Sequence, residues 1–258
     1  MIVGIIGVGV VGGTLKQWFE EFTSHDIRCH DPLKGLNDSL LGCDAIFISI
    51  PVPPLSDGQD LRGLREAVNL AKQHAEFVFI RSSVLPGTSD ELGCIAMPEY
   101  LTERKAFDDM KALPVLCGHV DEKLLDQLFP NKRKIIVPNK VAELAKYTHN
   151  CFGAFKVTYF NIIYDLSKAI GVDFDLVKAC ANLTGFIEPQ HTQVPGPDGA
   201  YGYGGKCFPE NMDAMKRFLH RVNLHGYGAM FEALQRTNEI QRFHESKTKK
   251  AEMFEDFN

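Results

Sequence analysis

The chain has 258 residues, of which 45% are hydrophobic and 24% are charged, which is ordinary for a globular protein of one large or two smaller domains. Its net charge of −5 argues against a nucleic-acid partner, and no apolar run is long enough to span a bilayer, so we expect no membrane partner. The seven scattered cysteines form no Cys-x-x-Cys pair, which indicates neither a disulfide framework nor a metal site and fits a reducing cytoplasm.

A strand over Ile2–Ile6 opens the chain, and a glycine-rich turn and a helix follow it. The turn reads Gly-Val-Gly-Val-Val-Gly, and its members are Gly7, Gly9, Val10, Val11 and Gly12. In this pattern the first glycine makes a tight turn, the second lets a pyrophosphate approach the backbone, and the third allows close packing of helix on strand. The apolar start lacks a basic segment, so we interpret it as a strand and not as a signal peptide.

A second strand, residues 26–30, ends at Asp31, about 20 residues beyond the glycines, where an acid would bind the adenosine ribose. Asp31 would repel a 2′-phosphate, so the sequence favours NAD over NADP, although Lys34 close by weakens that preference. The alternative is that Asp31 is only a turn residue before Pro32.

Two more strands are predicted over residues 44–50 and Phe77–Ile80, with a helix over residues 61–74 between them. In an open α/β sheet the carboxyl ends of the strands face the ligand crevice. We therefore expect Ser49, Pro51 and Ser83 to lie at a cofactor site. Ser82 and Ser83 could also cap a turn, which is the commoner role of loop serines.

Further along, Glu99 and Glu103 would share one face if their segment were helical, although a solvated acidic face is the alternative. Two strands over residues 113–117 and 134–137 flank a helix over residues 121–129. The alternation of strands and helices predicts an α/β fold with a mostly parallel, doubly wound sheet as a domain over residues 1–138.

The second half is predicted to be a helical domain over residues 139–244, with a charged tail over residues 245–258 that would fray. A helix over residues 141–169 is apolar around most of its circumference, so we expect burial on several sides and a homodimer formed through this helix. Lys146 and Asn150 share one of its faces; taken alone, Lys146 is more simply structural. Gly171 ends the helix, and Asp173 caps a shorter one.

A long loop over residues 184–205 leads into the stretch Gly-Tyr-Gly-Gly-Lys-Cys. Pro209 is expected to be the first residue of a helix over residues 209–222, followed by another over residues 227–243. A thiol just before a helix N-terminus and beside Lys206 should be unusually acidic, so we interpret Cys207 as a nucleophile. The alternative is that Cys207 is one more buried cysteine.

Together, these motifs resemble the UDP-glucose/GDP-mannose (nucleotide-sugar) dehydrogenases. The matching stretches follow one another in order along the chain, at residues 7–12, 81–88, 98–103, 142–150, 194–199, 202–209 and 238–239. The resemblance implies a Rossmann-like domain followed by an all-helical dimerisation domain with one long central helix. It also implies NAD as cofactor, a UDP-glucose-like substrate, a role in polysaccharide biosynthesis, and a short form without the C-terminal UDP-binding domain.

By the same resemblance, the enzyme would oxidise a primary alcohol to a carboxylate through a thiohemiacetal and a thioester on Cys207. Lys146 would stabilise the oxyanion or take part in proton transfer, and Asn150 would hold the oxyanion or a water. Glu99 would act as base in the hydrolysis, directly or through water. Ser83 would help to position that water, and Glu103 would lie near the nicotinamide ribose. The resemblance places substrate contacts at Glu99, Tyr100, Leu101, Lys146, Asn150, Tyr203, Gly204 and Cys207.

The sequence departs from the family at Asn211, where the family has a catalytic aspartate, and at Glu210, where it has a lysine. An amide can hold a water but cannot accept its proton, so Asn211 could serve only to hold it. The family's arginine before the glycine loop is also not evident. Two other hypotheses therefore stay open: a two-electron dehydrogenase of a smaller hydroxylated substrate, and a weakly catalytic NAD-binding protein that needs a partner subunit.

Overall fold

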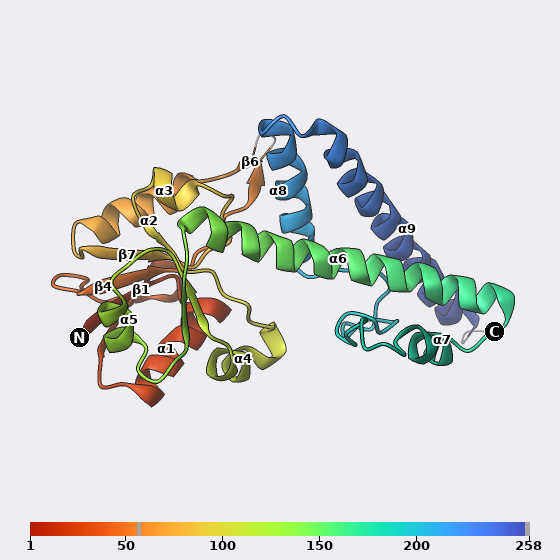
Figure 1. Cartoon of the computed structure of the whole chain (residues 1–258), viewed down its shortest axis with the longest axis horizontal. Coiled ribbons are helices and arrows are strands. Elements are labelled where there is room, and N and C mark those ends of the chain that lie inside the picture. Colours follow the sequence, from red (N-terminus) through yellow and green to blue (C-terminus); the bar gives the residue numbers. More distant parts are fainter. Residues whose placement is uncertain (56–57, 256–258) are drawn as a thin grey trace. The chain divides into compact units, whose positions relative to one another are not determined.

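The computed structural model describes residues 1–55 and 58–255, and the side chains up to residue 243. The chain divides into two compact units, Met1–Tyr147 and Thr148–Asn258. Figure 1 shows the sheet in the first unit and long helices in the second. No helix within the described part combines the length and the apolarity needed to cross a bilayer.

The first unit contains a six-stranded sheet. Its strand order is β3 (Leu36–Asn37), β2 (Asp26–Asp31), β1 (Ile2–Ile6), β4 (Ala45–Ile48), β7 (Phe77–Ile80) and β8 (Ile95–Ala96). All neighbours are parallel except β2 and β3, which are antiparallel. From β1 the chain adds β2 on one side and β4 on the other, so the sheet is doubly wound and a crevice for ligands is expected next to β1. The predicted α/β fold class is confirmed.

Alternating side chains divide the core of this unit into two layers. Ile5, Phe47 and Phe79 point to one face of the sheet and pack in one cluster with Leu15, Trp18 and Phe19 of α1 (Val10–Phe22). The same face carries α4 (Ala106–Ala112) and α5 (Glu122–Leu128). Ile46, Ile48 and Ile80 point to the other face, where α2 (Arg62–Lys72) covers them. Figure 1 shows α1 and α4 on one side of the sheet and α2 on the other.

Two strand pairs lie apart from this sheet. The predicted strands of the later part of the unit exist as β9 (Val115–Cys117) and β10 (Lys134–Ile136), but they pair with each other and not with the main sheet. The Gly118 N–H donates to the carbonyl of Ala96 (2.7 Å), yet the two ladders do not merge. Sequence analysis missed the short hairpin of β5 (Pro54–Leu55) and β6 (Gly58–Gln59), the one-turn helix α3 (Thr88–Glu91) and the 3₁₀ turns Pro32–Lys34 and Glu103–Lys105.

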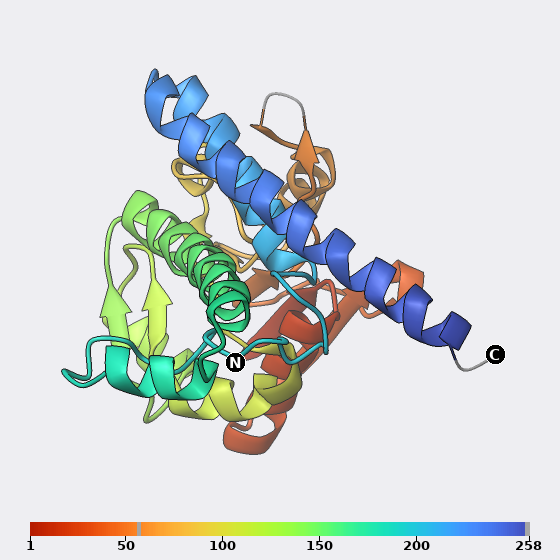
Figure 2. The same cartoon turned by 90° about the vertical axis from the view of Figure 1, so that its right-hand side faces the viewer.

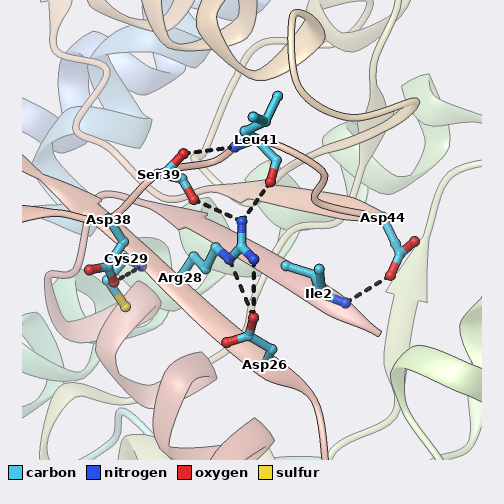
Figure 3. Close-up of polar contacts among 8 residues, drawn as sticks. All are labelled: Ile2, Asp26, Arg28, Cys29, Asp38, Ser39, Leu41 and Asp44. Atoms are coloured by element: carbon cyan, nitrogen blue, oxygen red, sulfur yellow. Dashed lines mark hydrogen bonds and ion pairs between the residues drawn. The ribbon is translucent and has the colours of Figure 1, made fainter.

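The segment between β3 and β4 is held by hydrogen bonds to strand residues (Figure 3). Arg28 donates to the carboxylate of Asp26 and to the carbonyls of Ser39 (3.2 Å) and Leu41 (2.5 Å). Asp38 accepts the N–H of Cys29 (2.8 Å), and Asp44 accepts the N–H of Ile2 (2.7 Å). These bonds fix the far end of the sheet, opposite the carboxyl ends of the parallel strands.

Helices make up the second unit. They are the greater part of α6 (Asn139–Ile170), then α7 (Phe174–Ala181), α8 (Cys207–Arg221) and α9 (His225–Glu255). Asp173 caps α7 as predicted, because its carboxylate accepts the N–H of Leu176 (2.8 Å). Helix α8 packs on α9, which Figure 2 shows as one long helix. Helix α9 runs to Glu255, beyond the predicted end at Phe243, so the first part of the expected tail is helical.

The helix α6 has two unlike faces in the second unit. Its buried residues include polar and small side chains, among them Asn150, Ala154, Thr158 and Asn161. Phe160 is also buried, but five other large apolar side chains are exposed, and they are Phe152, Tyr159, Ile162, Leu166 and Ile170. The expected burial on several sides is therefore not seen within one chain, because the packed side of this helix is largely polar and small.

Candidate functional site

The glycine turn has a geometry suited to a dinucleotide. At Gly7, which has a φ of +83°, an added Cβ would lie 2.6 Å from the carbonyl oxygen of Ser49, and at Gly12 it would lie 2.0 Å from that of Gly7. At Gly9 nothing lies within 4 Å of an added Cβ. The first and third glycines are therefore required by the turn and by packing, while the second leaves open space in front of the N-terminus of α1, where a pyrophosphate would bind. Val10 and Val11 begin that helix.

Asp31 and Lys34 both bind the backbone of this turn. The Asp31 carboxylate accepts the N–H of Val8 (2.9 Å), and the Lys34 ammonium donates to the Val8 carbonyl (2.6 Å). Asp31 is thus the last residue of β2 and lies at the glycine turn, as its predicted role in ribose binding requires. A carboxylate has more lone pairs than one N–H uses, so Asp31 can accept a ribose hydroxyl as well.

Other predicted cofactor residues lie at the carboxyl ends of β4 and β7. The hydroxyl of Ser49 is buried without a hydrogen-bond partner among the described residues, and Pro51 is exposed. Ser82, by contrast, is engaged twice with Ile50, because its hydroxyl accepts the N–H (3.1 Å) and donates to the carbonyl (2.7 Å). Ser82 therefore joins the two strand ends, while Ser83 lines a small hollow together with Lys146.

A buried ion pair joins Lys146 of α6 to Glu99. The Lys146 Nζ lies 3.3 Å from Glu99 Oε1, and the two side chains are only 5% and 9% exposed. Glu99 Oε2 also accepts the N–H of Leu101 (2.5 Å), and the ammonium lies 5.3 Å from the centre of the Tyr100 ring. The sequence could not decide between a structural and a catalytic Lys146, but the structure gives it a buried carboxylate partner. A buried lysine and glutamate in contact are suited to exchanging a proton with a substrate.

Arg81 is a site residue to which the sequence analysis gave no role. Its side chain is 5% exposed, and its Nε is buried without a hydrogen-bond partner among the described residues. Burial lowers the pKa of Arg81 to about 10, against the opposing effect of Glu99. Arg81, Glu99, Tyr100 and Leu101 line one hollow, so a second cation lies near the Glu99 carboxylate. The position of Arg81, directly after a buried strand, was the available signal.

Glu103 is not placed with Glu99 on a helical face. Glu99 lies outside any helix, while Glu103 is exposed in a 3₁₀ turn. Glu103 is therefore a solvated acidic residue, whereas Glu99 is largely buried and paired with Lys146.

In the second unit, Asn150 of α6 and Asn211 of α8 form a buried pair. Each residue is 4% exposed, and the Asn150 Nδ2 donates to Asn211 Oδ1 (2.9 Å). Two amides thus meet where the resemblance implies an amide and a carboxylate. Glu210, the neighbour of Asn211, has a raised pKa because it is partly buried, although Lys206 opposes the rise.

Cys207 is exposed and is the first residue of α8, with Lys206 as the N-cap. The prediction that Pro209 starts this helix is wrong by two residues, since Pro209 is its third residue. The N–H groups of the first helical turn have no partner within the helix, so a proline is tolerated at any of these positions. The thiol therefore lies within the first helical turn, where the helix dipole favours a thiolate. None of the seven cysteines, all of which are described, is in a disulfide.

The glycines before Cys207 are packed against the protein's own side chains. An added Cβ at Gly202 would lie 2.4 Å from Asn238 Oδ1, and one at Gly204 would lie 1.7 Å from Arg242 Nη2. Tyr203 is buried, and desolvation raises the pKa of its hydroxyl to about 12. This packing requires the glycines at 202 and 204, and at Gly202 the φ of +67° requires a glycine as well.

The first unit fits a nicotinamide dinucleotide. Gly9 leaves open a cradle that a side chain would fill, and a helix N-terminus, a carboxylate at the ribose position and a buried hydroxyl without a partner surround it. The described residues contain no cluster of histidine, cysteine, aspartate or glutamate that could hold a metal ion.

Comparisons with known proteins point to one family. Residues 140–240 match the model of the UDP-glucose/GDP-mannose dehydrogenase family, central domain. The chain is 29% identical to a UDP-glucose 6-dehydrogenase of Rhizobium meliloti over 83% of its own length and 62% of that protein. It spans 42% to 68% of the length of the first curated relatives.

Solved structures support the fold. A UDP-glucose dehydrogenase of Pyrobaculum islandicum superposes with a TM-score of 0.77 at 24% identity, over 93% of this chain and 68% of that one. A 3-hydroxyisobutyrate dehydrogenase of Mycobacterium tuberculosis superposes with a TM-score of 0.69 at 14% identity, over 93% of this chain and 94% of that one. At these identities the likeness concerns the fold alone.

Proposed function

We propose that this chain, whose residues 140–240 match the central domain of the UDP-glucose/GDP-mannose dehydrogenase family, is an NAD-dependent dehydrogenase that oxidises the primary alcohol of a nucleotide sugar to the carboxylate. The observation that carries the proposal is the buried Lys146–Glu99 pair, because a solvent-excluded ammonium and carboxylate in contact serve proton transfer better than they serve stability. The glycine turn and Asp31 supply the cofactor site.

NAD, when bound, accepts a hydride from the sugar carbon. Lys146 and Asn150 would stabilise the alkoxide that precedes each hydride loss, and Cys207 would attack the aldehyde carbon to form a thiohemiacetal. Loss of a second hydride leaves a thioester. Glu99 would then take a proton from water, with Ser83 holding that water, and attack by the water breaks the C–S bond and returns the thiolate.

The atoms balance over these steps. One primary alcohol and one water give one carboxylate, two hydrides and three protons, so each substrate requires two NAD. Of the groups proposed for these steps, Ser83, Glu99 and Lys146 belong to the first unit, and Asn150 and Cys207 belong to the second.

Oligomeric state and location belong to the same proposal. We expect a homodimer through α6, because its exposed apolar residues follow a seven-residue repeat in which Phe152, Tyr159 and Leu166 occupy one position. The five buried cysteines and the absence of disulfides suit a reducing cytoplasm.

A second candidate function is a two-electron dehydrogenase of a smaller hydroxylated substrate, and Asn211 is the observation that favours it. An amide at this position cannot act as base in thioester hydrolysis. In that case the reaction would end at the aldehyde or ketone, and Cys207 would be dispensable.

NADH formation over a panel of nucleotide sugars separates the candidates. The proposed function predicts two NADH per sugar, and Cys207→Ala should abolish the second. One NADH per substrate, with no effect of Cys207→Ala, would establish the two-electron reaction. Cofactor binding without turnover on any substrate would refute both and leave a binding protein that needs a partner subunit.

A further inference from the structure

Side chains of two helices hold the backbone of the loop that precedes Cys207. From α9, Asn238 accepts the N–H of Tyr203 (2.7 Å) and donates to its carbonyl (3.0 Å). From α6, Asn161 accepts the N–H of Gly202 (2.9 Å). Both asparagines are buried. Three hydrogen bonds from buried side chains therefore hold the loop backbone, although it is not part of a strand.

Arg242 lies one helical turn after Asn238 and bridges two parts of the same loop. Its Nε donates to the carbonyl of Tyr203 (3.1 Å), and its Nη2 donates to Asp198 Oδ2 (2.8 Å). Partial burial acts to raise the pKa of Asp198, but the hydrogen bonds from Arg242 and from the N–H of Ala200, together with the charge of Arg242, outweigh it and the pKa is lowered. The guanidinium thus links Asp198, early in the loop, to Tyr203, late in the loop, because its several N–H groups can donate in two directions at once.

Gly204 is shaped around this guanidinium. An added Cβ at residue 204 would lie 1.7 Å from Arg242 Nη2 and 2.6 Å from Cζ. The φ of Gly204 is outside the left-handed region, so the backbone conformation itself would accept an alanine. Arg242, and not strain in the turn, is what excludes a side chain at this position.

We propose that Arg242 is a positioning residue for Cys207. Only Gly205, with a φ of +69°, and Lys206 separate Gly204 from Cys207 at the start of α8. Because Arg242 fixes the backbone on one side of this short connection and α8 fixes the other, it determines where the thiol enters the first helical turn. The proposal concerns the thiol itself and rests on the proposed function only for its kinetic consequence.

The first test measures the reactivity of the thiol without cofactor or substrate. Cys180 and Cys207 are the exposed cysteines, so a Cys180→Ser background leaves Cys207 as the target of iodoacetamide. We expect Arg242→Met to change the rate of Cys207 alkylation by about two- to fivefold and to shift its pH profile, because the thiol moves relative to the helix N-terminus. Arg242→Lys, which keeps the charge without the fork, should restore the parent profile only in part.

Arg236→Met is the matched control. Arg236 lies on the same helix in an exposed ion pair with Glu232, and its removal should leave alkylation unchanged. If Arg242→Met and Arg236→Met have the same rate and pH profile as the parent, the proposal is overturned.

A double-mutant cycle tests the steric relation directly. Gly204→Ala alone should lower the melting temperature and alter Cys207 alkylation, because its Cβ collides with the guanidinium. In an Arg242→Ala background the same glycine substitution should have little effect on either. Equal effects of Gly204→Ala in both backgrounds would contradict the assigned contact.

Kinetics then separate this inference from the proposed function. If the parent oxidises a nucleotide sugar, Arg242→Met should lower kcat while the KM for NAD stays unchanged. If the parent oxidises no sugar, the proposed function fails, but the alkylation profile still decides whether Arg242 positions Cys207.

Discussion

Asn211 is the residue on which the extent of the proposed reaction depends. Its side-chain oxygen already accepts the amide of Asn150, so a carboxylate there would keep this hydrogen bond and add a proton acceptor. We expect Asn211→Asp to raise the steady-state rate of NADH formation by about tenfold or more if a general base for thioester hydrolysis is what the chain lacks, because this hydrolysis follows the loss of the second hydride. Steady-state measurement with the sugar that the parent accepts would show it.

Asn182→Asp provides the control for this substitution. Asn182 accepts the N–H of Ile187 in the second unit and has no proposed role in the reaction. A rate unchanged in Asn211→Asp would mean that thioester hydrolysis does not limit turnover in this chain.

Single residues were predictable where chemistry and spacing agree. The glycine turn and Asp31 lie where the motif places them, because a tight turn and a strand end leave little freedom. The burial of Arg81 could not be predicted, since an arginine is usually exposed and the residues that line its hollow, among them residues 97–101, 113–116 and Lys132, come from several later segments of the chain. The pairing of Asn150 with Asn211 joins residues far apart in the sequence, which periodicity cannot reveal.

Helix α6 is fixed at its first turns to the N-terminus of α3 by a buried carboxylate. Glu143 accepts the N–H of Gly87 (2.6 Å) and of Ser89 (2.8 Å), which are unbonded donors at the start of α3. Replacing Glu143 with alanine leaves the buried Ser89 donor unpaired, and we expect a loss of about 1–3 kcal/mol in the free energy of unfolding. Denaturant titration near pH 5 would measure it.

The pH dependence of this contact has a defined sign. Burial raises the pKa of Glu143 above its ordinary value of 4.5, despite the hydrogen bonds that lower it. A group whose pKa is raised by folding stabilises the fold below that ordinary value and loses the effect as the pH rises through the folded pKa. The free energy of unfolding of the parent, relative to Glu143→Gln, should therefore fall as the pH rises above about 4.5.

Glu122→Gln is the control for the pH series, because Glu122 is exposed at the start of α5. A parent-minus-variant difference for Glu143→Gln that stays flat, or that increases with pH, would contradict the prediction.

At the scale of elements, the long periodic segments were predicted best. The ends of α2 and α6 lie within two residues of the predicted ones, which followed from apolar spacing and, for α6, from Pro138 before it and Gly171 after it. The short elements β3, β5, β6 and α3 were missed, because two to four residues carry no period. The pairing of β9 with β10 outside the main sheet depends on where the sheet ends, which local sequence does not encode.

At the scale of the whole molecule, the two unlike faces of α6 bear on the oligomeric state. The helix contains enough apolar residues for full burial, yet within one chain its polar stripe is buried and its apolar stripe is exposed. The sequence predicted an apolar helix but could not show which stripe the chain itself covers. A second copy of the same helix could pack against the exposed stripe, because its own stripe has the same seven-residue repeat.

Acidic substitutions on this stripe test the dimer. We expect the parent to sediment as a dimer and Tyr159→Glu/Leu166→Glu to sediment as a monomer at micromolar concentration, because an isologous contact would bring each introduced charge close to its symmetry mate. Leu41→Glu, which adds an acid at an exposed leucine of the first unit, should stay dimeric. Far-ultraviolet circular dichroism would establish that each variant is folded. A folded double variant that remains a dimer would show that this stripe of α6 is not the interface.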